Sequence, residues 1–385
     1  MLRYITSGES HGKSLVGIIE GLPAGLSINS DEINHQLYRR QQGYGRGERM
    51  KIEQDTAVIL SGVRFGRTTG APIAVEIKNK DWENWQKTLS VEPLSENQLS
   101  EEITIPRPGH ADLAGLIKYG HTDIRNVIER ASARETGMRT ALGAIARLFL
   151  KEFNIDIGSH VIEIHTIKSS AIFNIADVTG ESLRADKSPV RCLDPEAETE
   201  MVSAIDRTKS KGDTVGGRIE IVVSGLPVGL GSYIQWDCRL DGMLAGTLMA
   251  IPGIKAVEIG LGVECGRRFG SEVHDEIVLG SGNNITRTSN NAGGIEGGIS
   301  NGQPLMITIT MKPIATLLSA LNSVDLKTKK AAKAHIERSD VCAVPAVSVV
   351  GEAVAALVLT QAFLDKFSGD NLEDIKMAYT SRRTL

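Results

Sequence analysis

Two stretches of nearly identical sequence, Gly21-Leu-Pro-Ala-Gly-Leu26 and Gly225-Leu-Pro-Val-Gly-Leu230, decide the fold of this chain. Each follows an apolar run with the character of a strand, and each precedes a second such run entered by Gly-x-Pro, at 69–77 and 301–309. This recurrence predicts an α+β fold with two pseudo-repeated antiparallel sheets around core helices. The alternative is that a common turn sequence occurs twice by chance.

The repeat favours a single domain over residues 1–385, with halves of roughly 1–150 and 151–385. Apolar alternation and turn residues predict strands at 2–6, 15–20, 56–63, 71–78, 156–166 and 217–224. Helical periodicity predicts helices at 31–41, 123–153, 197–210 and 240–251. The segment 123–153 is long and rich in alanine, so we expect it to be buried against close neighbours. Residues 81–106 are polar and are expected to form a surface excursion.

The segment Val341 to Phe363 is apolar and nearly long enough to cross a bilayer. Glu352 and Gln361 interrupt it, and Asp365 and Lys366 follow it directly. We therefore interpret it as a buried core helix, with a membrane span as the alternative.

The composition excludes several classes of protein. The 385 residues are 41% hydrophobic and 23% charged and include 40 glycines, with a net charge of −4, so neither disorder nor long-range attraction to nucleic acid or anionic membranes is expected. The four cysteines are scattered and form no CxxC pair or metal-binding cluster, which predicts reduced thiols and no metal site. The first residues lack the basic and apolar regions of a secretory signal, so a cytoplasmic location is expected.

The segment Gly8-Glu-Ser-His-Gly-Lys-Ser14 is similar to a nucleotide-binding P-loop, but the spacing of its glycines is one residue short and a strand follows it. The interpretation that remains is a glycine-bracketed turn that presents Ser10 and His11 to a ligand. A turn histidine with local hydrogen bonds is the alternative.

The segment from Arg39 to Met50 carries Arg39, Arg40, Arg46 and Arg49 with glycines between them. Guanidinium groups on an unhindered backbone suit a small polyanion with phosphate or carboxylate groups. A solvated basic loop and a nucleic-acid site are the alternatives, the latter disfavoured by the net charge and the single aromatic residue of the segment.

Further motifs combine arginine, histidine and glycine. They are Arg107-Pro-Gly-His-Ala-Asp112, Arg130-Ala-Ser-Ala-Arg-Glu-Thr136, the glycine-rich run 290–302, Lys312-Pro-Ile-Ala-Thr316 and Arg338-Ser-Asp340. Together they indicate an enzyme that acts on a small anionic phosphate ester with acid–base assistance.

In this order and over nearly the whole chain, GESHGKS, RRQQGYGRGERM, RPGHADL, RASARET, NNAGGIEGGISNGQP, MKPIAT and ERSD resemble the motifs of bacterial chorismate synthases. The resemblance implies a β-α-β sandwich, a homotetramer and a carbon–oxygen lyase of the shikimate pathway, which leads to the aromatic amino acids. Its substrate would be 5-enolpyruvylshikimate 3-phosphate, which loses phosphate and a ring hydrogen in an anti-1,4-elimination. The reaction would require reduced FMN without net redox change.

The resemblance also assigns site residues. His11 would assist departure of the phosphate, His110 would protonate or stabilise the reduced flavin, and Asp340 would handle the flavin N5 proton. The substrate-binding residues would be Ser10, Arg40, Arg46, Arg49, Arg107, Arg134 and Arg338. The FMN-binding residues would be Arg130, Ala131, Ser132, Pro252, Gly253, Gly297, Lys312, Pro313, Ile314, Ala315, Thr316 and Arg338.

Arg40 and Arg46 match positions that the family assigns to NADP, which is expected here only as an indirect reductant through an external flavin reductase. The sequence departs from many relatives at Arg338-Ser-Asp-Val341, at Pro252-Gly253 and at Ala131, which weakens the assignment of flavin contacts there. Two other classes remain open: a flavin- or phosphometabolite-binding protein without turnover, and a nucleic-acid binder.

Overall fold

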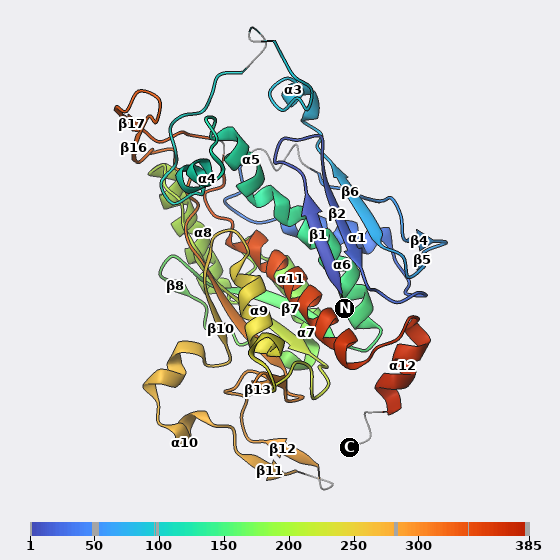
Figure 1. The fold of residues 1–385 in the computed structure, drawn as a ribbon. Coiled ribbons are helices and arrows are strands. Elements are labelled where there is room, and N and C mark those ends of the chain that lie inside the picture. The colour runs from blue at the N-terminus through green and yellow to red at the C-terminus, as the bar shows by residue number, and fades with distance from the viewer. Residues whose placement is uncertain are drawn as a thin grey trace.

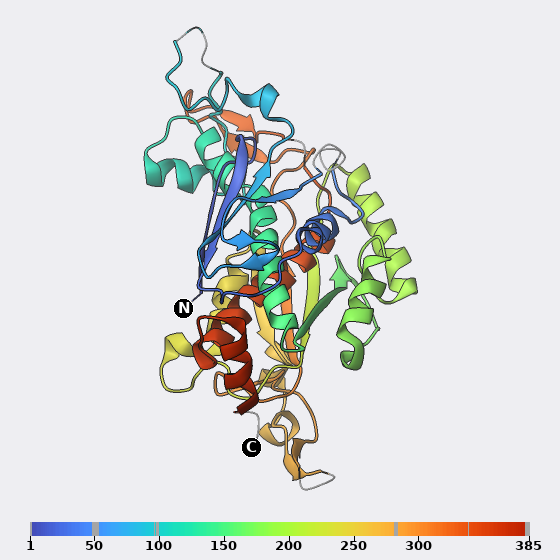
Figure 2. The same cartoon turned by 90° about the vertical axis from the view of Figure 1, so that its right-hand side faces the viewer.

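Two larger antiparallel sheets enclose a helical layer in the computed structural model, which describes residues 2–47, 54–95, 97, 100–280, 284–337 and 339–381 (Figures 1 and 2). The first sheet has the order β1 (Arg3–Ser7), β2 (Ser14–Glu20), β6 (Ile73–Lys78) and β3 (Ala57–Ile59). The second has the order β10 (Ile254–Ile259), β15 (Leu305–Met311), β9 (Gly217–Ser224), β7 (Asp156–Ile164) and β8 (Ile167–Lys168).

The helical layer consists of α6 (Thr136–Lys151) and α11 (Val344–Lys366), with α1 (Ser30–Gln41) and α9 (Leu240–Met249) packed against α11. The other helices are α3 (Trp82–Trp85), α4 (Asp112–Tyr119), α5 (Arg125–Ala131), α7 (Val178–Asp186), α8 (Pro195–Ser210), α10 (Gly270–Val273) and α12 (Leu372–Ser381). Short strand pairs are β4 (Val63–Arg64) with β5 (Arg67–Thr68), β11 (Ile277–Leu279) with β12 (Ile285–Arg287), β13 (Ile295–Glu296) with β14 (Ile299–Ser300), and β16 (Asn322–Val324) with β17 (Ala331–Lys333).

The two sheets share one topology. When β7, β9, β10 and β15 are put in place of β1, β2, β3 and β6, the second sheet repeats the strand order of the first and adds β8 at its edge. The helices follow the same rule, because α1 and α9 connect equivalent strands and α6 and α11 follow equivalent strands. The predicted α+β fold, with two pseudo-repeated antiparallel sheets around core helices, is confirmed.

The two repeated turns begin directly after β2 and after β9. Their first glycines, Gly21 and Gly225, have φ angles of 89° and 80°, and their fifth residues, Gly25 and Gly229, have 89° and 93°. Residues with a side chain rarely adopt this left-handed backbone conformation. Both turns therefore require glycine at these positions for the same reason.

Helices α6 and α11 approach each other closely at the centre of the molecule. A Cβ atom placed on Gly143 of α6 would lie 2.5 Å from both the Cβ and the carbonyl oxygen of Ala353 on α11. On the other side of α11, a Cβ on Gly351 would lie 2.6 Å from Ile221 of β9. Glycine therefore sets the spacing between the two helices and between α11 and the second sheet.

Helix α11 is long and apolar enough to cross a membrane, but 94% of its most apolar window is buried inside the protein. Its side chains contact α1, α6, α9, β7 and β9. The segment is thus the core helix that the sequence predicts.

A buried carboxylate lies in the middle of this apolar helix. Glu352 accepts hydrogen bonds from Arg39 of α1 at 2.7 and 3.0 Å, from Arg147 of α6 at 2.6 Å, and from Arg191 at 3.2 Å. The hydroxyl group of Ser159 on β7 is its fourth partner and donates a hydrogen bond at 2.6 Å. The group therefore joins α1, α6, α11 and the second sheet.

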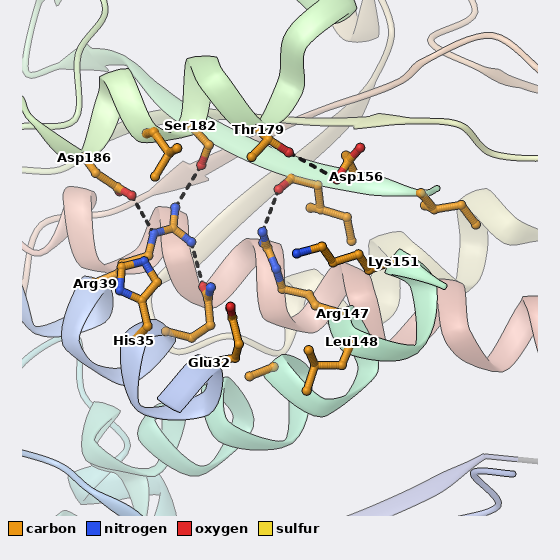
Figure 3. Close-up of a pocket in the computed structure, with 15 residues that line it drawn as sticks. Glu32, His35, Arg39, Arg147, Leu148, Lys151, Asp156, Thr179, Ser182 and Asp186 are labelled. Carbon is orange, nitrogen blue, oxygen red and sulfur yellow. Dashed lines mark hydrogen bonds and ion pairs between the residues drawn. The ribbon is translucent and has the colours of Figure 1, made fainter. Parts of the chain in front are cut away.

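Arg39 is bound on its other side by α7, and Figure 3 shows its guanidinium group between Asp186 and Ser182, at 2.8 and 2.9 Å. These side chains form part of the wall of a cavity of about 290 Å³ between α1, α6 and α7. The sequence predicts a polyanion site for the segment 39–50, but Arg39 takes no part in it: its donors are directed into the core, while the neighbouring Arg40 lines the cavity described below.

Two predicted elements differ from the structure. The long helix 123–153 is interrupted, because Ser132 is extended at φ −63° and ψ 140° and separates α5 from a single 3₁₀ turn, Ala133–Glu135, and α6. The predicted strand 56–63 is shorter, since β3 ends at Ile59. The residues before and after Ser132 are helical as predicted.

We expect Gly143→Ala to lower the free energy of unfolding by about 1–3 kcal/mol, because the added methyl group overlaps Ala353 and must displace α11. Urea denaturation measures this change. Gly246→Ala on α9 is the control: nothing lies within 4 Å of its added Cβ, so helix propensity should leave stability equal or slightly higher. Equal effects of both substitutions would contradict the close packing of α6 and α11.

We expect Glu352→Gln to lower the free energy of unfolding near pH 7 by about 3 kcal/mol, because Arg39, Arg147 and Arg191 all lose the charge of this buried carboxylate. Burial opposes ionisation of Glu352, but the charges of these arginines outweigh it and lower its pKa from the ordinary 4.5 to about 2.

Since this pKa is lower in the folded protein, the stabilisation is complete above pH 4.5 and is lost as the pH falls to 2. Urea denaturation of wild type and Glu352→Gln should therefore give a difference that narrows below pH 4.5. A difference that stays constant with pH would rule out a charge-based role for Glu352.

Candidate active site

The candidate site is a cavity of about 590 Å³ between the two halves of the fold. Its walls come from the loop between β1 and β2, the segment after α1, the loop before α4, the interruption between α5 and α6, the turn between α9 and β10, and the segments that follow β15 and precede α11. Both halves of the fold therefore contribute to one site.

The loop between β1 and β2 presents Ser10 and His11 to the cavity. Gly8 begins this loop with φ 106°, and a Cβ atom there would lie 2.4 Å from the carbonyl oxygen of Ser14. Only glycine fits this turn. The Ser10 amide donates to the carbonyl oxygen of Glu129 at 3.0 Å, which fastens the loop to α5.

A buried carboxylate orients each of the two cavity histidines. Nδ1 of His11 lies 2.9 Å from Glu129, and Nδ1 of His110 makes a short hydrogen bond with Asp112. Asp112 also accepts from Nε of Arg107 at 2.8 Å. Burial raises the pKa of Asp112, but the hydrogen bonds and charges of His110 and Arg107 outweigh this effect and keep the pKa well below its ordinary value.

The interruption at Ser132 forms the arginine-rich wall. Arg40 donates to Thr136 Oγ1 at 2.9 Å and to the carbonyl oxygen of Ala133 at 3.0 Å, both of which lie just beyond the interruption. Arg134 pairs with the buried carboxylate of Asp55 at 2.5 Å. An uninterrupted helix would not expose these groups to the cavity.

Asp340 lies opposite the glycine-rich segment that follows α1. Its Oδ1 accepts from the Gly47 amide at 2.6 Å, and its Oδ2 pairs with Arg46 at 2.9 Å. The backbone of Gly45 is close enough to Cys342 that a Cβ atom would lie 3.1 Å from the Cys342 Cβ, at a φ of 85°. Glycine thus lets this segment lie directly against the chain that carries Asp340.

The remaining wall is largely apolar. Pro252 and Gly253 follow α9, and Lys312 to Thr316 follow β15. Lys312 donates to the carbonyl oxygen of Gly109, which joins this wall to the loop of His110. Burial, assisted by the charge of Lys255, lowers the pKa of Lys312.

Most residues expected from the sequence line this cavity. They are Ser10, His11, Arg40, Arg46, Arg107, His110, Ala131, Ser132, Arg134, Pro252, Gly253, Lys312, Pro313, Ile314, Ala315, Thr316 and Asp340. Arg49 and Arg338 lie outside the described residues.

Two expected flavin contacts are not among the lining residues. Arg130 is exposed. Its guanidinium group donates to the carbonyl oxygens of Gly8 and Thr6 instead of lining the cavity. Gly297 lies in the turn between β13 and β14.

Sequence reasoning missed the carboxylates Glu129, Asp112 and Asp55. Each is buried and bound to an expected site residue. The position of Asp112 within the RPGHADL motif and of Glu129 just before RASARET was a usable signal, whereas nothing near Asp55 in the sequence marks it.

Comparison with known proteins identifies the family. The profile described as chorismate synthase matches residues 2–364 of the chain. The chain belongs to the chorismate synthase family. Its activity is accordingly that of a chorismate synthase, a lyase of the shikimate pathway.

The similarity to relatives extends over nearly the whole chain. The chorismate synthase of Carboxydothermus hydrogenoformans is 54% identical over 98% of this chain and 97% of its own length, and that of Aquifex aeolicus is 52% identical over 98% and 96%. A solved structure titled "Crystal Structure of Chorismate Synthase" is 42% identical, with a TM-score of 0.79 over 99% of this chain and 96% of its own.

Proposed function

We propose that the enzyme binds 5-enolpyruvylshikimate 3-phosphate and reduced FMN together in the cavity of about 590 Å³ and releases chorismate and phosphate by anti-1,4-elimination. The observation that carries this proposal is the gathering of His11, His110, Asp340 and the arginines in one cavity.

The cavity fits a flavin together with a small anion. Its volume lies within the range of about 300–1,000 Å³ typical of ligand sites. An apolar wall, which includes Met249, Ile254, Met311 and Ile314, suits a flat ring system, and the arginine-rich wall suits phosphate and carboxylate groups. When bound, reduced FMN would supply N5 as the acceptor of the ring hydrogen, in a reaction without net redox change.

Side chains of the protein would carry out the proton transfers and bind the leaving group. His11 would donate a hydrogen bond or proton to the departing phosphate, and His110, held by Asp112, would face the flavin. Asp340 would accept a proton on the flavin side of the cavity.

The substrate anions would be bound by Arg40, Arg46, Arg107 and Arg134, with Ser10, and the proposal extends to Arg49 and Arg338. The flavin would contact Ala131, Ser132, Pro252, Gly253 and Lys312 to Thr316. Arg130 and Gly297 are dropped from this proposal, since they are absent from the cavity lining.

We further propose that residues 1–385 form one domain, that the enzyme is a cytoplasmic homotetramer, and that an external reductase supplies the reduced flavin. One hydrophobic core that includes residues of both halves, from Leu2 to Tyr379, supports the single domain. The projecting β11–β12 arm supports an oligomer, because Leu279 and Ile285 are 73% and 75% exposed there (Figure 2).

We expect His110→Ala and Asp340→Ala each to lower the turnover number by at least about 100-fold, because each removes a group that handles a proton. The assay is anaerobic, with photoreduced FMN, and follows chorismate absorbance. His274→Ala, an exposed histidine at the end of α10, is the control.

Binding of FMN is measured in parallel by quenching of flavin fluorescence. Both variants should still bind it. If both fold but lose FMN binding, these residues support the flavin site rather than proton transfer. If wild type forms no chorismate with reduced FMN, the proposed function is wrong.

We expect the pure protein to form no chorismate from NADPH and oxidised FMN, because the chain is proposed to depend on an external reductant. Addition of a separate flavin reductase should restore the reaction to the rate seen with photoreduced FMN. Turnover with NADPH alone would contradict this dependence.

A further inference from the structure

The imidazole ring of His11 is held by two residues that no sequence motif assigned to the site. Glu129 of α5 lies 2.9 and 3.1 Å from Nδ1 through its two carboxylate oxygens, and it also accepts from the His11 amide at 2.8 Å. The indole of Trp85 stacks on the ring with 3.8 Å between centroids and 22° between planes. Nδ1 and one ring face are therefore both occupied by the protein.

Glu129 determines which ring nitrogen faces a ligand. An ionised carboxylate only accepts hydrogen bonds, so Nδ1 of His11 must carry the hydrogen in this contact. Nε2 has no hydrogen-bond partner in the described part of the chain, and His11 lines the cavity whereas Glu129 does not. The side chain of Glu129 is 2% exposed, so water does not compete for this contact.

Trp85 determines the plane of the ring. It is the last residue of α3, which Figure 1 shows at the end of the first sheet, near the β1–β2 loop. Its own Nε1 donates to Asp81 at 2.9 Å, and the guanidinium carbon of Arg125 lies 5.8 Å from its ring centroid. The segment expected to be a surface excursion thus places an anchored aromatic ring against a cavity residue.

We propose that Glu129 and Trp85 are positioning residues that hold His11 with Nε2 directed at the phosphate ester of the substrate. The carboxylate fixes the tautomer and would balance the charge of the ring when Nε2 is protonated. The indole prevents rotation of the ring and covers one of its faces. This inference rests on the role proposed for His11.

The first test is a double-mutant cycle in the anaerobic assay. Glu129→Gln should lower the turnover number by about 10- to 100-fold with little change in KM, because the amide group fixes neither tautomer nor charge. His11→Ala should cost more. If Glu129 acts only through His11, adding Glu129→Gln to His11→Ala should cause no further loss.

Additive losses in this cycle would overturn the inference and leave Glu129 as a general support of the fold. No loss in His11→Ala alone would instead refute the proposed role of His11, so the two failures are distinguishable. Glu135→Gln is the matched control: Glu135 is also buried and paired, but its partners are Thr6 at 2.6 Å and Arg139 at 3.0 Å rather than His11. Circular dichroism and thermal melting check that each variant folds.

The second test concerns Trp85. Trp85→Phe should retain most of the turnover because a phenyl ring can still stack, Trp85→Ala should lose about 10-fold or more, and Trp82→Ala, three residues earlier on α3, should have no effect. Equal turnover in Trp85→Phe, Trp85→Ala and wild type would overturn the role of the stack.

A spectroscopic measurement complements these rates. Because the chain has three tryptophans, Trp82→Phe with Trp236→Phe leaves Trp85 as the sole indole. Adding 5-enolpyruvylshikimate 3-phosphate without flavin should change its emission, and His11→Ala in the same background should abolish that change. If the emission of Trp85 still changes in the His11→Ala variant, Trp85 senses the substrate independently of His11, which would contradict its proposed role.

Discussion

The arrangement of the helices depends on the buried carboxylate of Glu352. It lies at the centre of an otherwise apolar helix and binds arginines from α1 and α6 and Arg191, at distances that leave little freedom of translation. A charge buried without partners is very costly, so each helix is held in the one register that satisfies this group. Arg39 ends in that cluster, and Arg40, the next residue, lines the candidate cavity of about 590 Å³. Because Arg39 and Arg40 are consecutive, the contacts of Arg39 in the core also fix the position of Arg40 in the arginine-rich wall.

The cavity lies where the two repeated halves meet, which explains why its residues are dispersed along the sequence. The β1–β2 loop and the interruption between α5 and α6 come from the first half, and the segments after α9 and β15 come from the second. A duplicated fold offers two similar surfaces that can diverge: here the first half provides the histidines and most of the arginines, and the second provides the apolar wall.

Much of the fold was predictable because its signals are local. The glycines of the repeated turns have positive φ angles, and the apolar composition of α6 and α11 reflects burial on nearly all sides. The interruption at Ser132 was not predictable from periodicity, since α5 and α6 continue the same apolar pattern on both sides of it. Pairing of Asp55 with Arg134 and stacking of Trp85 on His11 depend on contacts between distant segments, which composition and spacing do not encode. The burial of Arg39 against Glu352 and Asp186 depends on such contacts as well.

The position of α11 after both sheets in the sequence has a consequence for synthesis of the chain. Both sheets, α6 and the three arginines are made before Glu352. Until α11 is made, the parts of α6 and of the second sheet that it contacts have no cover, and the three arginines lack the carboxylate of Glu352. A nascent chain that ends before residue 344 therefore cannot form this core. Formation of the core is therefore expected to wait until α11 has been made.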